Sequence, residues 1–368
     1  MTKDRQDRIR DVLSELGADW ALLSTPDAVC YATGQVIPIE TGPSPFTGGP
    51  ALAFIGRQGG TGLVCSNVEA TDLPATLDAE IYTGFAGNVV DQITNYRAAV
   101  QRIVRHLNVD GRVAIQMGSH PACLHDLIPI TIPIDNMFQR ARAIKTPSEI
   151  AALRAAATVA SAGQIAARNV SRAGISEIEA LNAIRGVMEQ KAGERCALAG
   201  EYLGGIDHSA TLGTKPGPRR LLEGDPVLCD LAPRVAGYWG DSCNSFTLGA
   251  PSEAWRTIYT TVHETLMLAI STLRPGITVH AFDTSLRENM QKVGLVYPHH
   301  SGHGIGTSVH EWPRIVPHEY GLIEENMVLM VEPGAYVPGV GGLRCEHMLR
   351  VTATGAEVLT DFAMGVSE

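Results

Sequence analysis

The chain has 368 residues, of which 45% are hydrophobic and 18% are charged, and its formal net charge is −10. This length and composition are typical of a globular protein with about two domains, and the acidic balance argues against non-specific binding to nucleic acid. The charged N-terminus lacks the apolar core of a signal peptide, and no apolar run approaches the length of a membrane span. We therefore expect a cytoplasmic protein without a membrane partner.

Residues 1–141 predict a small α/β domain in which helices and strands alternate. The expected helices are 3–17 and 90–107, and the expected strands are 20–24, 51–55, 62–65 and 112–116. The Pro- and Gly-rich segment 41–50 predicts a surface loop, with a lid over a neighbouring site as the alternative.

A domain boundary is expected between residues 141 and 142, and the second domain runs to residue 368. Thr146, Pro147 and Glu149 form the pattern of a helix start, with a capping residue, a first-turn proline and a capping-box acid. The expected elements then run twice in the order helix, helix, strands. The first set is 147–169, 176–191, 197–212 and 227–246, and the second is 253–273, 279–293, 305–310, 327–337 and 343–352. This order predicts an α+β domain with two pseudo-twofold halves.

The segment 227–246 predicts two antiparallel strands joined at Gly237. Each strand carries one acid, Asp230 and Asp241, and a hairpin would bring the two into one site. Buried acids that face each other repel, and a metal ion is the usual remedy. The alternative is that each acid lies at a strand end on the surface.

Two further stretches carry groups that can bind metals. Residues 297–311 contain four histidines, with glycines on both sides of His303 that permit close approach of a ligand or another strand. Glu332 and Glu346 each lie in an apolar run that predicts a strand. The glycine-containing residues 297–311 lack the strand-loop-helix context of a phosphate-binding loop.

Four carboxylates and one imidazole suit two hard divalent cations. Oxygen-rich ligation favours manganese, with cobalt, zinc or iron as alternatives. Cys229, Cys243 and Cys345 lie beside these acids, and we interpret them as small buried residues rather than thiolate ligands. The seven cysteines show no CxxC spacing and no disulfide framework. Two ions that share a water molecule can support hydrolysis of an amide bond.

The order and spacing of these five residues, with the words GHGIG, VEPG and GLRCE, resemble the pita-bread metallopeptidase family, in its prolidase and Xaa-Pro aminopeptidase branch. The resemblance is strong over residues 142–360 and implies a pita-bread domain behind a creatinase-like N-terminal domain. It implies a dinuclear metallopeptidase, either a dipeptidase or an aminopeptidase, that acts on short Xaa-Pro peptides. Two-domain relatives of this kind are often homodimers.

The resemblance also assigns roles. The implied metal ligands are Asp230, Asp241, His303, Glu332 and Glu346. Glu332 would also accept the proton of the attacking water. His310 would contact the substrate carbonyl, Arg344 would orient a ligand, and His300 would lie beside the site. The alternative for His310 is a strand residue bonded to the sheet.

The chain departs from the family around the substrate. Gly213 stands where the family has a histidine in the loop before the first acid, and His208 is five residues away. Cys243, Asn244 and Ser245 also stand where the family has Thr-Arg-Thr, and His347 stands where it has Asp. We therefore keep two alternatives: the same metal site acting as hydrolase or lyase on a small non-peptide molecule, and an inactive pita-bread module that binds a protein.

Overall fold

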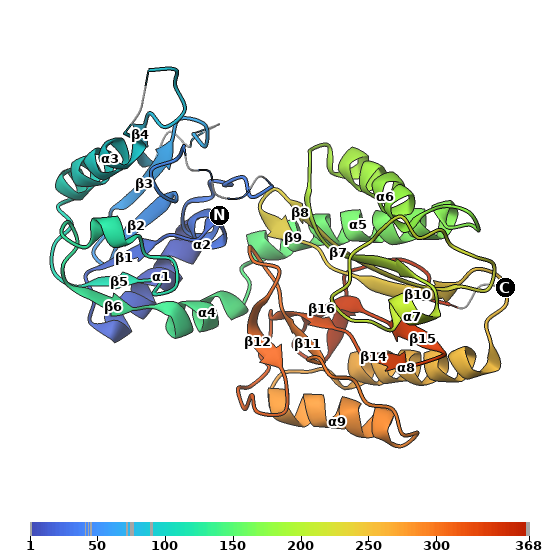
Figure 1. Cartoon of the computed structure of the whole chain (residues 1–368). Coiled ribbons are helices and arrows are strands. Elements are labelled where there is room, and N and C mark those ends of the chain that lie inside the picture. Colours follow the sequence, from blue (N-terminus) through green and yellow to red (C-terminus); the bar gives the residue numbers. More distant parts are fainter. Residues whose placement is uncertain are drawn as a thin grey trace. The chain divides into compact units, whose positions relative to one another are not determined.

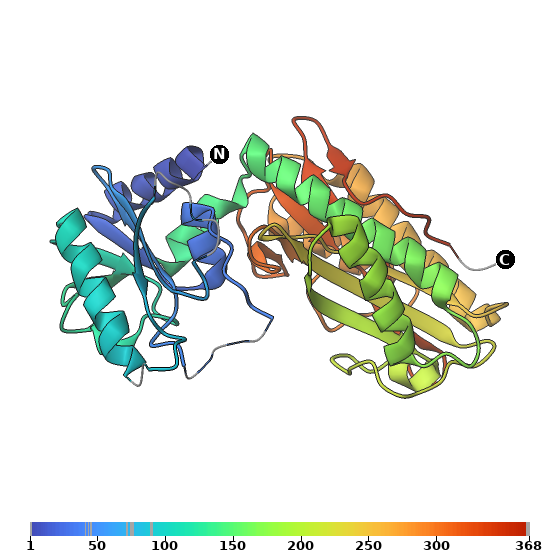
Figure 2. The same cartoon turned by 90° about the horizontal axis from the view of Figure 1, so that it is seen from above.

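The structure is a computed structural model that describes residues 2–365, except 41, 43, 45, 71, 72, 74–76, 89 and 90. The chain divides into two compact units, residues 1–142 and 143–368 (Figures 1 and 2). The predicted assignment of these regions as a creatinase-like and a catalytic domain remains a proposal.

The first unit is a six-stranded mixed sheet with helices on both faces. Its strands, in the sheet order β4-β3-β2-β1-β5-β6, are β1 (Trp20–Leu23), β2 (Leu52–Gly56), β3 (Thr61–Ser66), β4 (Asp78–Tyr82), β5 (Val113–Ile115) and β6 (Thr131–Pro133). Its helices are α1 (Thr2–Leu16), α2 (Pro26–Thr33), α3 (Gln92–Leu107), η1 (Ala122–Leu124) and α4 (Asp135–Ala143). Helices α1, α2 and α4 share a core with one face of the sheet, and α3 and η1 share a core with the other face.

Several elements of this unit differ from the sequence prediction. Helix α3 begins at Gln92, and residue 90 of the predicted helix lies outside the described residues. Helix α2 was not predicted because six of its eight residues are buried, which removes the amphipathic period. In the 41–50 segment, residues 41, 43 and 45 are not described, and the lid interpretation stays a prediction.

The second unit contains two similar sets of helices and strands. The first set is α5 (Pro147–Val170), α6 (Glu177–Ala192), β7 (Ala197–Gly204), α7 (Ile206–Ser209), β8 (Pro226–Val235), β9 (Tyr238–Trp239) and β10 (Cys243–Thr247). The second set is α8 (Glu253–Thr272), α9 (Val279–Gln291), β11 (Gly302–Gly304), β12 (Glu311–Ile315), β13 (Val328–Val331), β14 (Gly334–Val337), β15 (Gly341–Arg344), β16 (His347–Val351) and β17 (Ala356–Val358).

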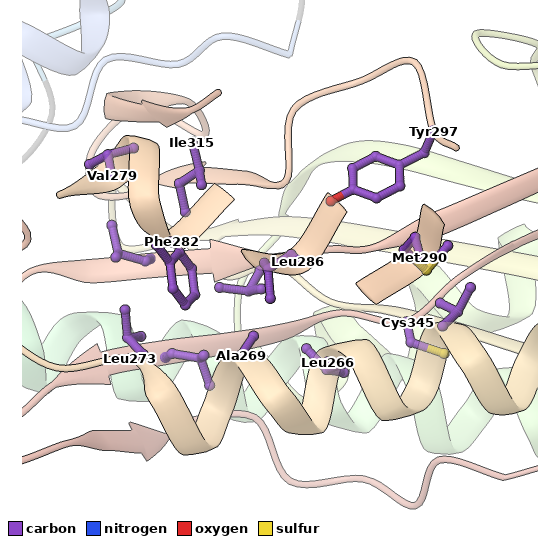
Figure 3. Packing of buried hydrophobic residues seen from close by; sticks show 14 of the residues in the cluster. Leu266, Ala269, Leu273, Val279, Phe282, Leu286, Met290, Tyr297, Ile315 and Cys345 are labelled. Atoms are coloured by element: carbon purple, nitrogen blue, oxygen red, sulfur yellow. The ribbon is translucent and has the colours of Figure 1, made fainter. Parts of the chain in front are cut away.

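Each set builds its own helix-on-sheet core. Strands β10-β8-β7 form one sheet, with β9 also paired to β8, and β12-β11-β13-β16-β17 form another. Helices α5 and α6 share a core with β7, β8 and β10, whereas α8 and α9 share a core with the second group of strands. Figure 3 shows Leu266 and Ala269 of α8 with Phe282 and Leu286 of α9 in this second core. The order of elements thus follows the predicted two halves.

Helix α5 starts as the sequence predicts. Thr146 and Glu149 form both hydrogen bonds of a capping box, and Pro147 lies in the first turn.

Contrary to the sequence expectation, α5 is long and apolar enough to span a membrane by length and composition. However, 61% of that apolar window is buried inside the protein, as in the core helix of a folded domain.

Three predicted strands have different limits. Strand β7 ends at Gly204, and the short helix α7 follows where the sequence predicted more strand. Residues 305–310 form a bend between β11 and β12, not a strand, and the β11–β12 register shifts next to His303. Asp241 lies in the short gap between β9 and β10 rather than within a strand.

Candidate metal centre

Asp230 and Asp241 reach one site from a hairpin. Strand β8 pairs with β9 and then with β10 in an unbroken register in which Cys243 lies opposite Asp230. Asp241 precedes Cys243 by two residues, so Asp230 and Asp241 lie on the same face. The turn uses Ala236 and Gly237, both at positive φ, as a tight hairpin requires. The alternative of two acids at exposed strand ends is therefore wrong, because both acids line a cavity.

His303 occupies the centre of β11, between β12 and β13. Its flanking glycines are required by packing, since a Cβ at Gly302 would lie 1.9 Å from the Met330 carbonyl oxygen. His303 Nδ1 donates to the Gly304 carbonyl at 2.9 Å, which leaves Nε2 as an acceptor. This Nε2 lies 3.7 Å from Asp241 Oδ2.

Glu332 and Glu346 come from the ends of two other strands. Glu332 follows β13, and its Oε1 lies 3.6 Å from His303 Nε2. Glu346 lies between β15 and β16, and its backbone N–H donates to the Cys243 carbonyl at 2.9 Å, which connects the two halves of the unit. The candidate ligand atoms of Asp241, His303 and Glu346 all lie within 4.8 Å of one another.

Burial and mutual repulsion dominate the electrostatics of these acids. Burial raises the pKa of Asp241 and of Glu346 well above the ordinary range, and the neighbouring carboxylates raise both further. Burial also raises the pKa of Glu332, but the His300 hydrogen bond and the charges of His303 and Arg344 bring it to about 2. Glu346 Oε2 is buried and accepts no hydrogen bond from any described residue. Arg344 therefore compensates the negative charge of these buried carboxylates only in part.

Arg344 ties Asp230 to a hydrogen-bonded chain. Its Nη2 donates to Asp230 Oδ2, and its Nη1 donates to the Tyr336 hydroxyl at 2.8 Å. Tyr336 lies 3.0 Å from His299 Nε2, and because His299 Nδ1 donates to the His300 carbonyl, Tyr336 is the donor of this bond. The sequence analysis missed Tyr336 and His299, although the hairpin β14–β15 places Tyr336 near Arg344.

His300 and His310 complete the rim of the site. His300 Nδ1 accepts from Arg314 Nε at 3.2 Å, so its Nε2 donates to Glu332 Oε1 at 2.9 Å. The exposed His310 ring packs edge-on against His303, with the ring centroids 4.4 Å apart. His310 lies in the bend before β12, so the alternative of a strand residue is wrong.

A buried ion pair holds this bend. Glu311 Oε1 accepts from the Ser308 backbone N–H at 3.1 Å, and its Oε2 contacts Lys145 Nζ at 2.6 Å. Each side chain of the Lys145–Glu311 pair is only 1% exposed. A backbone hydrogen bond from Trp239 to Gly306 ties the same bend to β9.

The loop before β8 brings no histidine to the site. Gly213 lines the cavity at φ +76°, and a Cβ there would meet no atom within 4 Å. His208 does not line the cavity, because its Nδ1 bonds to the buried Glu177 Oε1 at 2.6 Å. The departure at Gly213 is therefore not compensated by His208.

All eight predicted site residues line one cavity of about 500 Å³. They are Asp230, Asp241, His300, His303, His310, Glu332, Arg344 and Glu346. The sequence analysis missed one acid that also lines it, Glu201, which pairs directly opposite Asp230 in the β7–β8 ladder. No local sequence signal singles it out, because its place at the site depends on the register of β7 against β8. Cys243 and Cys229 are buried, and burial raises the pKa of both thiols, which favours the neutral form over thiolate ligation.

Comparison with known proteins places this geometry in context. Residues 151–353 match the model of metallopeptidase family M24. An uncharacterized peptidase of Staphylococcus aureus (strain USA300) is 29% identical over 366 residues, which cover 96% of this chain and 98% of that protein. The Xaa-Pro dipeptidase of Pyrococcus furiosus is 31% identical over 233 residues, or 62% of this chain and 66% of that protein. The solved structure of an Xaa-Pro dipeptidase from Bacillus anthracis superimposes with a TM-score of 0.83 at 24% identity, over 100% of both chains, and confirms the predicted fold class.

Proposed function

Because the chain belongs to metallopeptidase family M24, it is a hydrolase, and we propose that it cleaves amide bonds with two divalent metal ions. The proposed ligands are Asp230, Asp241, His303, Glu332 and Glu346. The observation that carries this proposal is the convergence of Asp241, His303 and Glu346 within 4.8 Å. The unsatisfied Glu346 Oε2 and the raised pKa of Asp241 and Glu346 fit a donor set that a cation would complete.

The chain's own groups fit hydrolysis. Two bound ions would lower the pKa of a water molecule and polarise a carbonyl. Glu332, oriented by the hydrogen bond from His300, would accept the proton of the attacking water. His310, at the exposed rim, would donate to the substrate carbonyl. Arg344 would hold Asp230 in its ligating orientation. Manganese is the ion we favour, with cobalt, zinc and iron as alternatives.

The proposed substrates are Xaa-Pro dipeptides or peptides with an N-terminal Xaa-Pro. The similarity to the Xaa-Pro dipeptidase of Pyrococcus furiosus supports this choice. The open space at Gly213, with His208 bound to Glu177, supports a second candidate, a small non-peptide substrate of a hydrolase or lyase. The inactive binding module is disfavoured because all five candidate ligands line one cavity. We further propose a cytoplasmic homodimer with neither nucleic acid nor membrane as partner.

The test combines metal content with turnover. Protein purified without chelator, and after reconstitution with manganese, is analysed for bound metal and assayed with Ala-Pro and Xaa-Pro-Xaa peptides. We expect about two ions per chain and turnover that requires them, with H303A as the variant that loses metal. Less than one ion after reconstitution would favour the binding module. A fully loaded protein that does not cleave prolyl peptides would exclude the proline assignment.

A further inference from the structure

Glu201 is an acid of the cavity that the proposed reaction does not use. It lies on β7 directly opposite Asp230, so both carboxylates are on the same face of the sheet. Its side chain is only 20% exposed. It is not part of the five-residue ligand set, and Ala199, Gly200 and Gly213 are among the residues that line the same cavity.

The Glu201 carboxylate is only partly compensated by the protein, through the charge of Arg344 and a backbone hydrogen bond from Gly213. Its nearest cation is Arg344, whose Nη2 lies 3.8 Å away, beyond hydrogen-bond distance. Arg344 already donates to Asp230 and to Tyr336. Among the described residues, no side chain donates a hydrogen bond to Glu201, and Lys215, which lines the same cavity, pairs with none of the described acids. Burial raises the pKa of Glu201, the Arg344 charge lowers it, the Asp230 charge raises it and the Gly213 backbone hydrogen bond lowers it, and the net shift is upward.

A half-buried carboxylate with open space beside it attracts a positively charged ligand group. In an Xaa-Pro substrate, the α-ammonium group is attached to the carbon next to the scissile carbonyl. A carbonyl held at the cluster of Asp241, His303 and Glu346 would therefore carry its ammonium group within the same cavity. We propose that Glu201 is a specificity-determining residue that binds the cationic ammonium group of the substrate. This inference deepens the proposed function and rests on it.

The competing explanation is that Glu201 only helps to position Arg344. The two explanations differ in the ligands they affect. A positioning role would change the binding of every substrate alike, whereas an ammonium subsite would affect only cationic substrates. Propionyl-proline supplies the comparison, because it has the skeleton of Ala-Pro without the ammonium group.

The experiment compares these two ligands with metal-loaded wild-type protein, Glu201→Gln, and the control Glu325→Gln, which changes an exposed acid outside the cavity. If the wild type cleaves Ala-Pro, KM for Ala-Pro and the inhibition constant of propionyl-proline are measured. If it does not, the proline assignment fails on its own, and dissociation constants of both ligands are measured by calorimetry instead.

We expect Glu201→Gln to weaken Ala-Pro at least about tenfold, as loss of a charge-assisted hydrogen bond does. It should leave the inhibition or dissociation constant of propionyl-proline within about twofold of wild type, and Glu325→Gln should change the binding of neither ligand. Equal changes for Ala-Pro and propionyl-proline in Glu201→Gln, or no change for either, would overturn the proposal. A thermal melt of each variant shows that the fold is retained.

Discussion

The buried pair of Lys145 and Glu311 gives a prediction whose size follows from the structure. Replacing Lys145 with Met removes the ammonium group that lies 2.6 Å from Glu311 Oε2. Both side chains are 1% exposed, so water cannot replace the lost contact. Loss of one partner of a buried pair costs about 3–5 kcal/mol. For a unit of 143–368, that cost corresponds to a melting temperature roughly 6–20 °C lower.

A double variant separates charge from packing. Lys145→Met with Glu311→Leu removes both charges, and replacing a buried pair with apolar residues is often neutral or stabilising. The double variant still loses the acceptor for the Ser308 N–H, which costs about 1 kcal/mol. We therefore expect it to be more stable than Lys145→Met alone, within about 1–2 kcal/mol of wild type by urea unfolding.

Activity should respond differently from stability. Glu311 holds the bend that carries His310, so the double variant should recover stability without recovering turnover. The reasoning is refuted if the unfolding free energy of Lys145→Met lies within about 1 kcal/mol of the wild-type value. It is also refuted if the double variant is less stable than either single variant.

Three further predictions follow from other contacts. Tyr336→Phe leaves the Arg344 Nη1 without its 2.8 Å acceptor and should lower kcat about tenfold with metal content unchanged. A kcat equal to that of wild type would contradict the idea that Tyr336 positions Arg344. Burial raises the pKa of Asp27, but the charge of Arg142 and the hydrogen bonds from Thr25, Arg142 and the backbone together lower it below 3.8. The stabilisation by Asp27 is therefore present above pH 3.8 and is lost as the pH falls through the folded pKa. Asp27→Asn should thus destabilise the first unit by about 1–3 kcal/mol at pH 7. Urea unfolding should show this difference shrinking as the pH falls below 3.8, and a constant difference would contradict the pairing. In Gly213→His, the new Cβ meets no atom within 4 Å, so the variant should fold with a backbone cost of about 1–2 kcal/mol. It should turn over Xaa-Pro-Xaa peptides faster than wild type. An unchanged rate would show that the missing imidazole does not limit cleavage.

The sequence predicted the parts of the molecule that local patterns encode. The Thr146–Glu149 capping box is a contiguous signal, and the structure contains it. The hairpin from 227 to 246 brings Asp230 and Asp241 together because a tight turn at Gly237 fixes the pairing of its own strands. The ligand roles of these residues remain predictions.

The features that the sequence analysis missed depend on contacts between distant segments. Glu201 is significant only because β7 pairs with β8 in one particular register, and that register is not visible from either strand alone. The bend at 305–310 was predicted as a strand, although only Ile305 and Val309 are apolar and they do not alternate with polar residues. The glycines that start it are instead required by the approach of other strands, as at Gly304, where a Cβ would lie 2.4 Å from the Trp312 carbonyl oxygen.

The backbone contact between Glu346 and Cys243 joins strands from the two halves of the second unit. Asp230 and Asp241 come from one half, whereas His303, Glu332 and Glu346 come from the other. Neither half alone carries a complete ligand set, so cations bound by these five groups would favour the assembled pair of halves over the separated ones. Through this mass-action coupling, each tenfold excess of free ion over its dissociation constant would add about 1.4 kcal/mol to the unfolding free energy of this unit, while the first unit, which supplies none of the five, would gain nothing.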